Sequence, residues 1–324
     1  MGTLRKTDAR VIRQPAAPLQ DCGTLRFGRV TAADIRRLSP LLHAAGTRSC
    51  DFTAGGIFMW ADYFRYQAVV RDGTLFISGL SQDASRIPSF LLPAGGLSAA
   101  GAVDVLRAHC RATGQPLLIS AVPEDRLPEL LPLGVVRVDE LADWADYIYR
   151  ATDLAGLAGK AYNKKRNHVH RFEADNPGAL LESLTPANVG EAAAFLRSLE
   201  EPTGKANPEM AAYERDRCLD VLRDYDLYPF EGAVLRGAGG RIVAFTIGEV
   251  SGDTLIVHVE KMDHTVSGAG EAVNCYFARY MLDRHPELVY INREDDSGDP
   301  GLRFAKESYH PAFLLRKYNV VLSL

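Results

Sequence analysis

The fold of this chain is decided by one stretch, RIVAFTIGEVSGDTLIVHVEKMDHTVSGAGEAVNCYFARYMLDRHPELVYIN, residues 241–292. Two apolar runs flank the turn SGD, and this pattern predicts an antiparallel hairpin. A glycine turn then leads into a segment of helical composition from 268 to about 284, and ELVYIN predicts one more strand. The stretch therefore predicts a strand, a strand, a helix and a strand, in that order.

This order is similar to the core of acyltransferases of the GNAT type. Their turn has the pattern Q/R-x-x-G-x-G/A, and TVSGAG places Gly268 and Gly270 at its glycines but Thr265 at its first position. Glycine lets the backbone approach a phosphate, and helix N-terminal amides bind anions. The turn predicts a phosphate site, with Asn274 on the following helix as a further substrate-binding candidate. An ordinary glycine turn before a helix is the alternative.

Composition limits the function classes. Of 324 residues, 47% are hydrophobic and 24% charged, as in globular proteins, and the net charge of -4 argues against non-specific coating of nucleic acid. The five cysteines are dispersed without a CxxC pair, so we expect no disulfide framework and no metal site. No run approaches the roughly 20 apolar residues of a membrane helix. Walker, nucleophile-elbow, zinc-protease and dinucleotide motifs do not occur in the sequence.

Positive charge is concentrated in LAGKAYNKKRNHVHRF, residues 157–172, within a predicted helix from 154 to about 174. No acid interrupts the segment. Lysines and arginines in such a cluster can neutralise phosphates of RNA. A solvated helix face is the alternative. The candidate substrate-binding residues here are Lys160, Lys164, Lys165, Arg166 and Asn167.

The strand TLIVHVEKM, residues 254–262, carries polar side chains among apolar ones. Alternation places His258 and Glu260 on one face. A His–Glu pair beside a phosphate turn is a candidate base site, and a cross-strand polar pair is the alternative. Lys261 could reach a phosphate or carboxylate, or be a solvated strand-end lysine.

A third polar cluster lies in YINREDDSGDPGLRFAKESYHP, residues 290–311. Ligand groups gather beyond the carboxyl ends of strands in α/β sheets. We therefore expect Arg293 to hold a carboxylate or phosphate, and Glu294 or Asp295 to accept a proton. A solvated loop is the alternative. The remaining candidates are Asn292 at the strand end and Arg303, Lys306 and Tyr309, which share one face of a short helix.

Four segments together carry a family resemblance: DWADYIYRATDLAGLAGKAYNKKRNHVHRF, VAFTIGEV, VHVEK and YINREDDSGDPGLRFAKESYHP. They resemble an uncharacterised bacterial family related to the C-terminal, catalytic domain of phosphatidylglycerol lysyltransferase, from about Thr24 to the end. The resemblance implies an α/β (α+β) fold of two tandem GNAT-like domains with mixed, mostly antiparallel sheets flanked by helices, as in Fem-type aminoacyltransferases. The expected division is a disordered lead-in, 1–22, and domains at 23–155 and 156–324.

The resemblance implies a transferase that moves an aminoacyl group from aminoacyl-tRNA onto a lipid headgroup, small molecule or peptide. Direct attack in an interdomain cleft would need no covalent enzyme intermediate and no tightly bound cofactor. Glu260, Glu294 or Asp295 would accept the proton. Two alternatives stay open: an acyl-CoA-dependent N-acyltransferase and a catalytically silent binding module. We expect a cytoplasmic protein, peripheral to the membrane at most, with the apolar run from Gly56 to Phe64 in a core helix. A lipid-facing patch is the alternative for this run.

Overall fold

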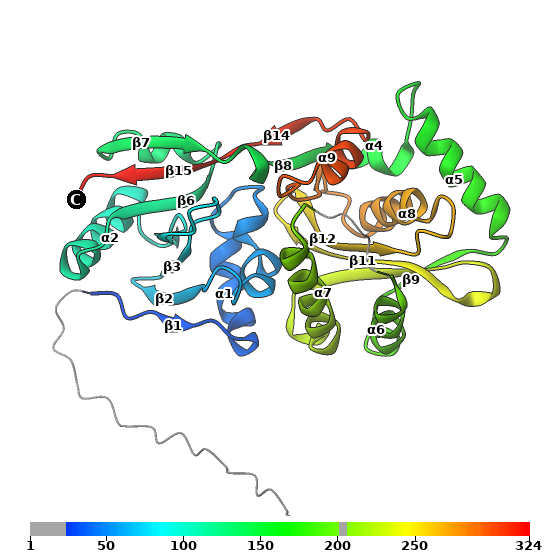
Figure 1. Ribbon diagram of the computed structural model, residues 1–324, viewed down its shortest axis with the longest axis horizontal. Helices are drawn as coiled ribbons and strands as arrows, with labels where there is room; N and C mark the ends of the chain where they lie inside the picture. The colour runs from blue at the N-terminus through cyan, green and yellow to red at the C-terminus, as the bar shows by residue number, and fades with distance from the viewer. Residues whose placement is uncertain (1–23, 201–205) are drawn as a thin grey trace, which may run out of the picture.

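The computed structural model describes residues 24–200 and 206–324, which form two sheets flanked by helices (Figure 1). The predicted lead-in, 1–22, lies outside the described residues. The first sheet has the order β1-β2-β3-β4-β6-β15-β7, and β5 pairs with β3. Its strands are β1 (Gly28–Arg29), β2 (Gln67–Arg71), β3 (Thr74–Leu80), β4 (Pro88–Phe90), β5 (Ala94–Gly95), β6 (Leu117–Pro123), β7 (Val135–Glu140) and β15 (Lys317–Leu322).

The second sheet contains the deciding stretch and has the order β14-β8-β13-β12-β11-β10-β9. The predicted hairpin is confirmed as β11 and β12, and β13 lies parallel to β12, while the other neighbours are antiparallel. Its strands are β8 (Asp146–Arg150), β9 (Leu180–Ser183), β10 (Phe230–Arg236), β11 (Ile242–Ser251), β12 (Thr254–Met262), β13 (Tyr290–Asn292) and β14 (Phe313–Leu315).

Helices cover both faces of the second sheet (Figure 1). Leu255 and Val257 of β12 pack with α8, whereas Val259 packs with α6 and α7. The helices are α1 (Ile35–His43), α2 (Ala99–Thr113), α3 (Leu127–Leu130), α4 (Ala151–Gly156), α5 (Asn163–Asp175), α6 (Val189–Ser198), α7 (Pro208–Arg223), α8 (Ala269–Arg284) and α9 (Pro300–Glu307). Short helical segments are η1 (Ala32–Asp34), η2 (Cys50–Phe52), η3 (Gly55–Met59), η4 (Ala142–Trp144), η5 (Tyr225–Leu227) and η6 (Ala238–Gly240).

The two sheets exchange strands across the predicted boundary at 155/156. Strand β8 precedes this boundary but pairs with β13 and β14 of the second sheet. Strand β15 lies near the end of the sequence but pairs with β6 and β7 of the first sheet. The boundary therefore does not separate the two sheets.

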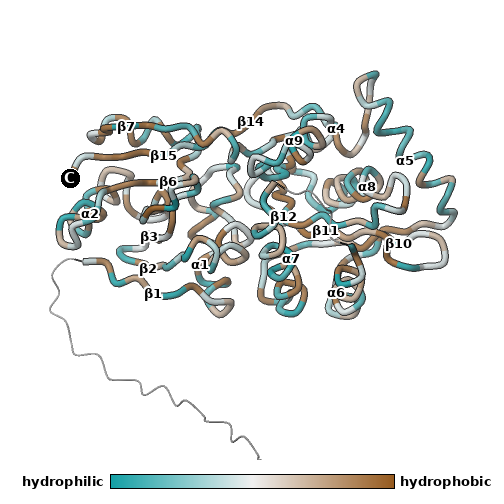
Figure 2. Tube along the Cα trace, viewed as in Figure 1, coloured by the Kyte–Doolittle hydropathy of each residue, from teal (hydrophilic) through white to brown (hydrophobic). Residues whose placement is uncertain are grey.

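Two helical predictions have different outcomes. The apolar run from Gly56 begins in the core, where η3 is buried, but it leaves the helix after Met59, and residues 60–63 are partly or fully exposed. The predicted continuous helix from 154 to 174 is wrong, because the chain breaks into α4 and α5. Leu157 and Gly159 between them have left-handed backbone angles, with φ of 46° and 80°. Figure 2 shows that α5 is hydrophilic along most of its length.

A buried ammonium group joins the elements that cross between the sheets. The Nζ atom of Lys317, on β15, lies 2.7 Å from Asp51 Oδ2 and 2.8 Å from Asp146 Oδ1. Asp51 belongs to η2 and Asp146 begins β8. Lys317 and Asp146 are fully buried, so both carboxylates depend on this one cation for charge compensation.

We expect Lys317→Met to destabilise the protein by about 3–5 kcal/mol, because it leaves two buried carboxylates without their cation. The measurement is urea unfolding followed by fluorescence. The control is Arg316→Met at the neighbouring exposed position, which should change stability by about 0.5 kcal/mol or less. Equal stability of the two variants would contradict the role given to Lys317.

Candidate functional site

The candidate site lies where β12 and β13 separate. The two strands pair only from Thr254 to Ile256 and from Tyr290 to Asn292. Strand β12 continues to Met262, and within the described part of the chain its pairing with β13 ends at Ile256 and Asn292. Two ion pairs cross this divergence: Glu260 with Arg293, and His258 with Glu294.

The prediction that His258 and Glu260 share one face is wrong. Ile247 pairs with Val259 and Gly248 with Val257, so His258 is the extra residue of a β-bulge. A bulge breaks the alternation of side chains. The His258 ring lies 5.4 Å from the Phe230 ring, whereas Glu260 bonds to Asn274 on α8, across the sheet.

On the α8 side, Glu260 is the centre of a group of charged and aromatic residues. Its carboxylate accepts hydrogen bonds from Arg293 Nη2 at 2.9 Å and from Asn274 Nδ2 at 3.2 Å. The Arg293 guanidinium lies 4.8 Å from the centre of the Tyr309 ring. Among the described residues, Arg293 Nη1 and Asn274 Oδ1 are buried without a hydrogen-bond partner. The group thus offers one free donor and one free acceptor.

Helix α5 adds a cation to this group. Lys165 Nζ lies 3.9 Å from the centre of the Tyr309 ring and 3.5 Å from Glu271 Oε1. Burial lowers the pKa of Lys165, and Glu271 opposes this effect. Of the five basic-segment candidates, Lys165 is the one that reaches the site.

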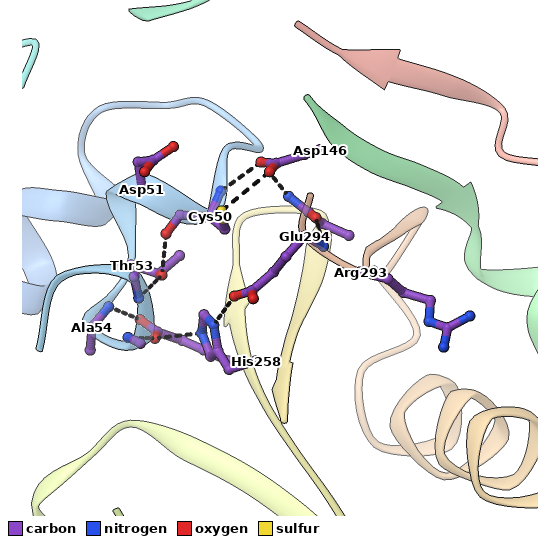
Figure 3. A network of polar contacts seen from close by, with 12 residues as sticks. Cys50, Asp51, Thr53, Ala54, Asp146, His258, Arg293 and Glu294 are labelled. Carbon is purple, nitrogen blue, oxygen red and sulfur yellow. Dashed lines mark hydrogen bonds and ion pairs between the residues drawn. The ribbon is translucent and has the colours of Figure 1, made fainter. Parts of the chain in front are cut away.

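On the opposite side, His258 lies between two carboxylates (Figure 3). Its Nδ1 is 2.7 Å from Glu294 Oε1, and its Nε2 is 3.3 Å from Glu249 Oε2. Burial alone would lower the pKa of His258, but hydrogen bonds to Glu249 and Glu294 outweigh burial and raise it to about 9. His258 is therefore a cation at neutral pH. It packs against Gly55, where any side chain would overlap the ring.

Glu249 is fully buried and ionised. It accepts hydrogen bonds at 3.0 Å from the backbone amides of Ala54 and Gly55, and His43 Nε2 lies 2.5 Å from its Oε1. Burial would raise the pKa of Glu249, but the bonds from His258 and His43 outweigh burial and lower it to about 2. These contacts connect the hairpin to the N-terminal half.

Asp295 lies in a separate buried cluster near Lys317. Burial raises the pKa of Asp295 to about 6, although Lys317 and Lys306 oppose the rise. Asp295, Asp146 and Cys50 have ligand atoms within 4.8 Å of one another, a spacing that suits a metal ion. The Lys317 ammonium already bonds to Asp146 and Cys50 there, so a cation is present.

Several candidate substrate-binding side chains form hydrogen bonds or ion pairs with other parts of the protein. Asn292 donates to the backbone of Arg48 and to Asp146. Lys306 donates to the carbonyls of Arg293 and Asp295, and Arg303 forms a bidentate bond to Asp296. Arg303 and Lys306 lie on α9, whereas Tyr309 follows the end of this helix, and all three contact the loop after β13. Arg166 likewise donates to carbonyls of 157 and 159, and Lys261 pairs with Glu214 at 2.7 Å.

The glycines of the predicted phosphate turn have packing roles. Gly268 has φ of 78° and precedes α8, and a side chain there would collide with the carbonyl oxygen of His168 on α5. Gly270 packs against Met262. Helix α5 thus covers the N-terminus of α8, which favours the structural interpretation of the turn.

Sequence reasoning missed His43 and Glu249. Glu249 could have been found from the sequence, because it is the one acid in the apolar run 242–250. A charged side chain in a buried strand needs a partner. His43 left no such signal, since it contacts a residue 206 positions away.

Comparison with known proteins shows the family of the chain. The family described as "Phosphatidylglycerol lysyltransferase, C-terminal" matches residues 44–321. The chain belongs to this family. Family and fold indicate an aminoacyltransferase related to lysylphosphatidylglycerol synthase and confirm the predicted GNAT-like α+β fold. No helix among the described residues is long and apolar enough to cross a bilayer.

Solved structures include a Bacteroides thetaiotaomicron protein of unknown function, with TM-score 0.78 and 28% identity over 92% of this chain and 99% of that one. The C-terminal domain of a putative lysylphosphatidylglycerol synthetase from Agrobacterium fabrum has TM-score 0.61 and 16% identity, covering 90% and 93%. The L-PGS of Bacillus licheniformis has TM-score 0.60 and 15% identity, covering 89% and 91%. An uncharacterised Mycoplasmoides gallisepticum protein is 21% identical, and the match spans about half of each chain, 54% here and 55% there.

The raised pKa of His258 predicts a pH-dependent contribution to stability. Its folded value of about 9 exceeds the ordinary 6.5, so the stabilisation is complete below about pH 6.5 and is lost as the pH rises through 9. We expect His258→Gln to cost roughly 3 kcal/mol more near pH 6 than near pH 10. Unfolding by urea at both pH values measures this, and a pH-independent difference would show that folded His258 is neutral.

Proposed function

We propose that this protein transfers an aminoacyl group from aminoacyl-tRNA to an amine or hydroxyl acceptor where β12 and β13 separate. One observation carries the proposal: Arg293 Nη1 and Asn274 Oδ1 are buried and unpartnered on either side of Glu260. An aminoacyl ester has a carbonyl oxygen that accepts a hydrogen bond and an ammonium group that donates them. The free donor and acceptor match these two groups.

Each residue then has a defined role in direct attack. Arg293 donates to the carbonyl oxygen and stabilises the negative charge that develops on it. Glu260 and Asn274 accept hydrogen bonds from the ammonium of the aminoacyl group. Glu294 accepts the proton of the attacking amine or hydroxyl and passes it to the ribose oxygen that leaves. No covalent enzyme intermediate and no bound cofactor take part.

Glu294 suits the base role better than the other two predicted acids. Glu260 is held by Arg293 and Asn274, and Asp295 by the amide and hydroxyl of Ser297. Glu294 has one carboxylate oxygen on His258, and its side chain is partly exposed.

Helix α5 supplies a basic surface for the RNA. Lys160 and Lys164 are exposed, and Asn167, His168 and His170 are exposed beside them. Since Lys165 of the same helix lies against Tyr309, the surface adjoins the Arg293 group. RNA bound along α5 would therefore have its aminoacyl end near Arg293.

We expect Lys160→Ala/Lys164→Ala to weaken binding of bulk bacterial aminoacyl-tRNA and to lower its salt dependence by about one phosphate contact per lysine. The measurement is a binding titration at several salt concentrations. The control is Arg71→Ala/Arg137→Ala, which removes two exposed cations of the first sheet. Equal weakening by both variants would refute a specific RNA surface. If the protein binds acetyl-CoA but does not bind tRNA, the result would support the acyl-CoA-dependent alternative.

We expect Arg293→Met to slow aminoacyl transfer by about 10²–10³-fold while tRNA affinity is retained, because an oxyanion donor is lost. The assay is single-turnover deacylation of the tRNA pool in the presence of lipid vesicles or small amines. The control is Arg284→Met, which removes an exposed arginine of α8.

An unchanged transfer rate in Arg293→Met would show that Arg293 takes no part in the reaction. Intact cellular function after alanine replacement of Glu260, Glu294 and Asp295 would support the silent binding module instead.

A further inference from the structure

The first sheet ends at β7, a strand with one open edge. Strand β7 pairs with β15 on one side, and no other strand of the described chain pairs with its second side. Figure 1 shows β7 as the outermost strand of this sheet. Residues 136–140 are all exposed, and Val136 and Val138 are 69% and 37% exposed. Apolar β-branched side chains on an unpaired edge favour pairing with another strand.

The charged residues of this edge have an order that complements itself. Arg137 and Asp139 lie on one face of β7, where Arg137 Nε is 2.7 Å from Asp139 Oδ2. The next acid, Glu140, already lies 3.7 Å from Arg316. If a second copy pairs antiparallel with β7 about a twofold axis at Val138, Arg137 lies opposite the partner's Asp139, and Asp139 lies opposite the partner's Arg137. The four side chains then form a closed ring of alternating charges.

Of the three central positions of β7, only Val138 gives this match. Successive residues of a strand direct their backbone groups to opposite edges, so a twofold antiparallel pair is centred on one residue rather than between two. Centring the pair on Arg137 would oppose two arginines, and centring it on Asp139 would oppose two aspartates. Like charges directly opposite each other are destabilising, whereas opposite charges and paired β-branched residues are favourable. The irregular pairing of β7 with β15 occurs at Val136, outside these three positions.

We propose that two copies of this chain dimerise through β7, joining their first sheets antiparallel about Val138 into one continuous sheet. The outward backbone groups of β7 gain hydrogen-bond partners, and the exposed valines lose contact with water. Because one strand of six residues forms the contact, the dimer is small and reversible. It does not depend on the proposed function, since β12 and β13 belong to the second sheet.

Sedimentation velocity from about 1 μM to about 1 mM tests the dimer, because this range covers weak associations. The full wild-type chain should shift from monomer to dimer within it. Arg137→Asp and Asp139→Arg each place like charges opposite each other at two points of the contact, so each should weaken dimerisation at least about tenfold. Both positions are exposed, and the thermal unfolding of the dilute monomer should not change.

Mixing the two charge-reversal variants gives the decisive result. Arg137→Asp carries two acids on this face of β7, and Asp139→Arg carries two arginines. In a mixed dimer each acid lies opposite an arginine, so an equimolar mixture should associate although each variant alone stays largely monomeric. This recovery also shows that both variants are folded.

Arg29→Asp is the matched control. Arg29 is likewise an exposed arginine paired with an aspartate, Asp62, but it lies on β1 at the opposite end of the same sheet. Its reversal should leave the dimer unchanged. Val138→Lys places two ammonium groups opposite each other at the twofold axis, and it should weaken dimerisation as the charge reversals do.

Four results would each overturn the proposal. The wild type could remain monomeric throughout the concentration range, or Arg137→Asp could leave the dimer intact. The two charge-reversal variants could fail to associate with each other. Arg29→Asp could weaken the dimer as much as Arg137→Asp does, which would place the contact elsewhere. Growth of the wild type into species larger than a dimer would show association without the twofold register, and this too contradicts the proposal.

Discussion

The ammonium of Lys317 fixes the geometry on which the site depends. It binds Asp146, and the other oxygen of Asp146 accepts from the side chain of Asn292. Asn292 in turn accepts from the backbone amide of Glu294. A cation on the last strand therefore sets the position of the loop that carries Arg293 and Glu294. Because every link is buried or partly buried and bonded at both ends, the loop has little freedom to relax.

The same loop is held from its other side by α9. Lys306 donates to two of its carbonyls, and Arg303 binds Asp296. Glu294 has φ of 59°, an unusual conformation for a residue with a side chain. Such a backbone persists where the surroundings impose it, and it is common at functional sites. The cations of α9 thus hold the backbone segment that positions the side chains of Arg293 and Glu294.

Periodicity and turn chemistry predicted the β11–β12 hairpin and helix α8, because these features depend on neighbouring residues. Strand alternation and the position after a strand singled out Glu260, Arg293 and Glu294, but not the ion pairs that Glu260 and Glu294 form. The face of His258 could not be predicted, since one bulged residue reverses the alternation. The true partners of Lys306 and Arg166 are backbone carbonyls, which leave no mark on side-chain patterns. The sequence shows where the basic side chains are, but it cannot show which of them form bonds within the folded protein.

The exchange of strands between the sheets has a consequence for synthesis of the chain. Strand β15 lies between β6 and the edge strand β7, so the position between these two strands stays vacant until residues 317–322 have left the ribosome. Until then β6 and β7 each present an unpaired edge, which is a template for association with other chains. Folding cannot proceed one half at a time from the N-terminus, as is usual for multidomain proteins. The nascent N-terminal half therefore keeps unpaired strand edges exposed until β15 pairs with β6 and β7.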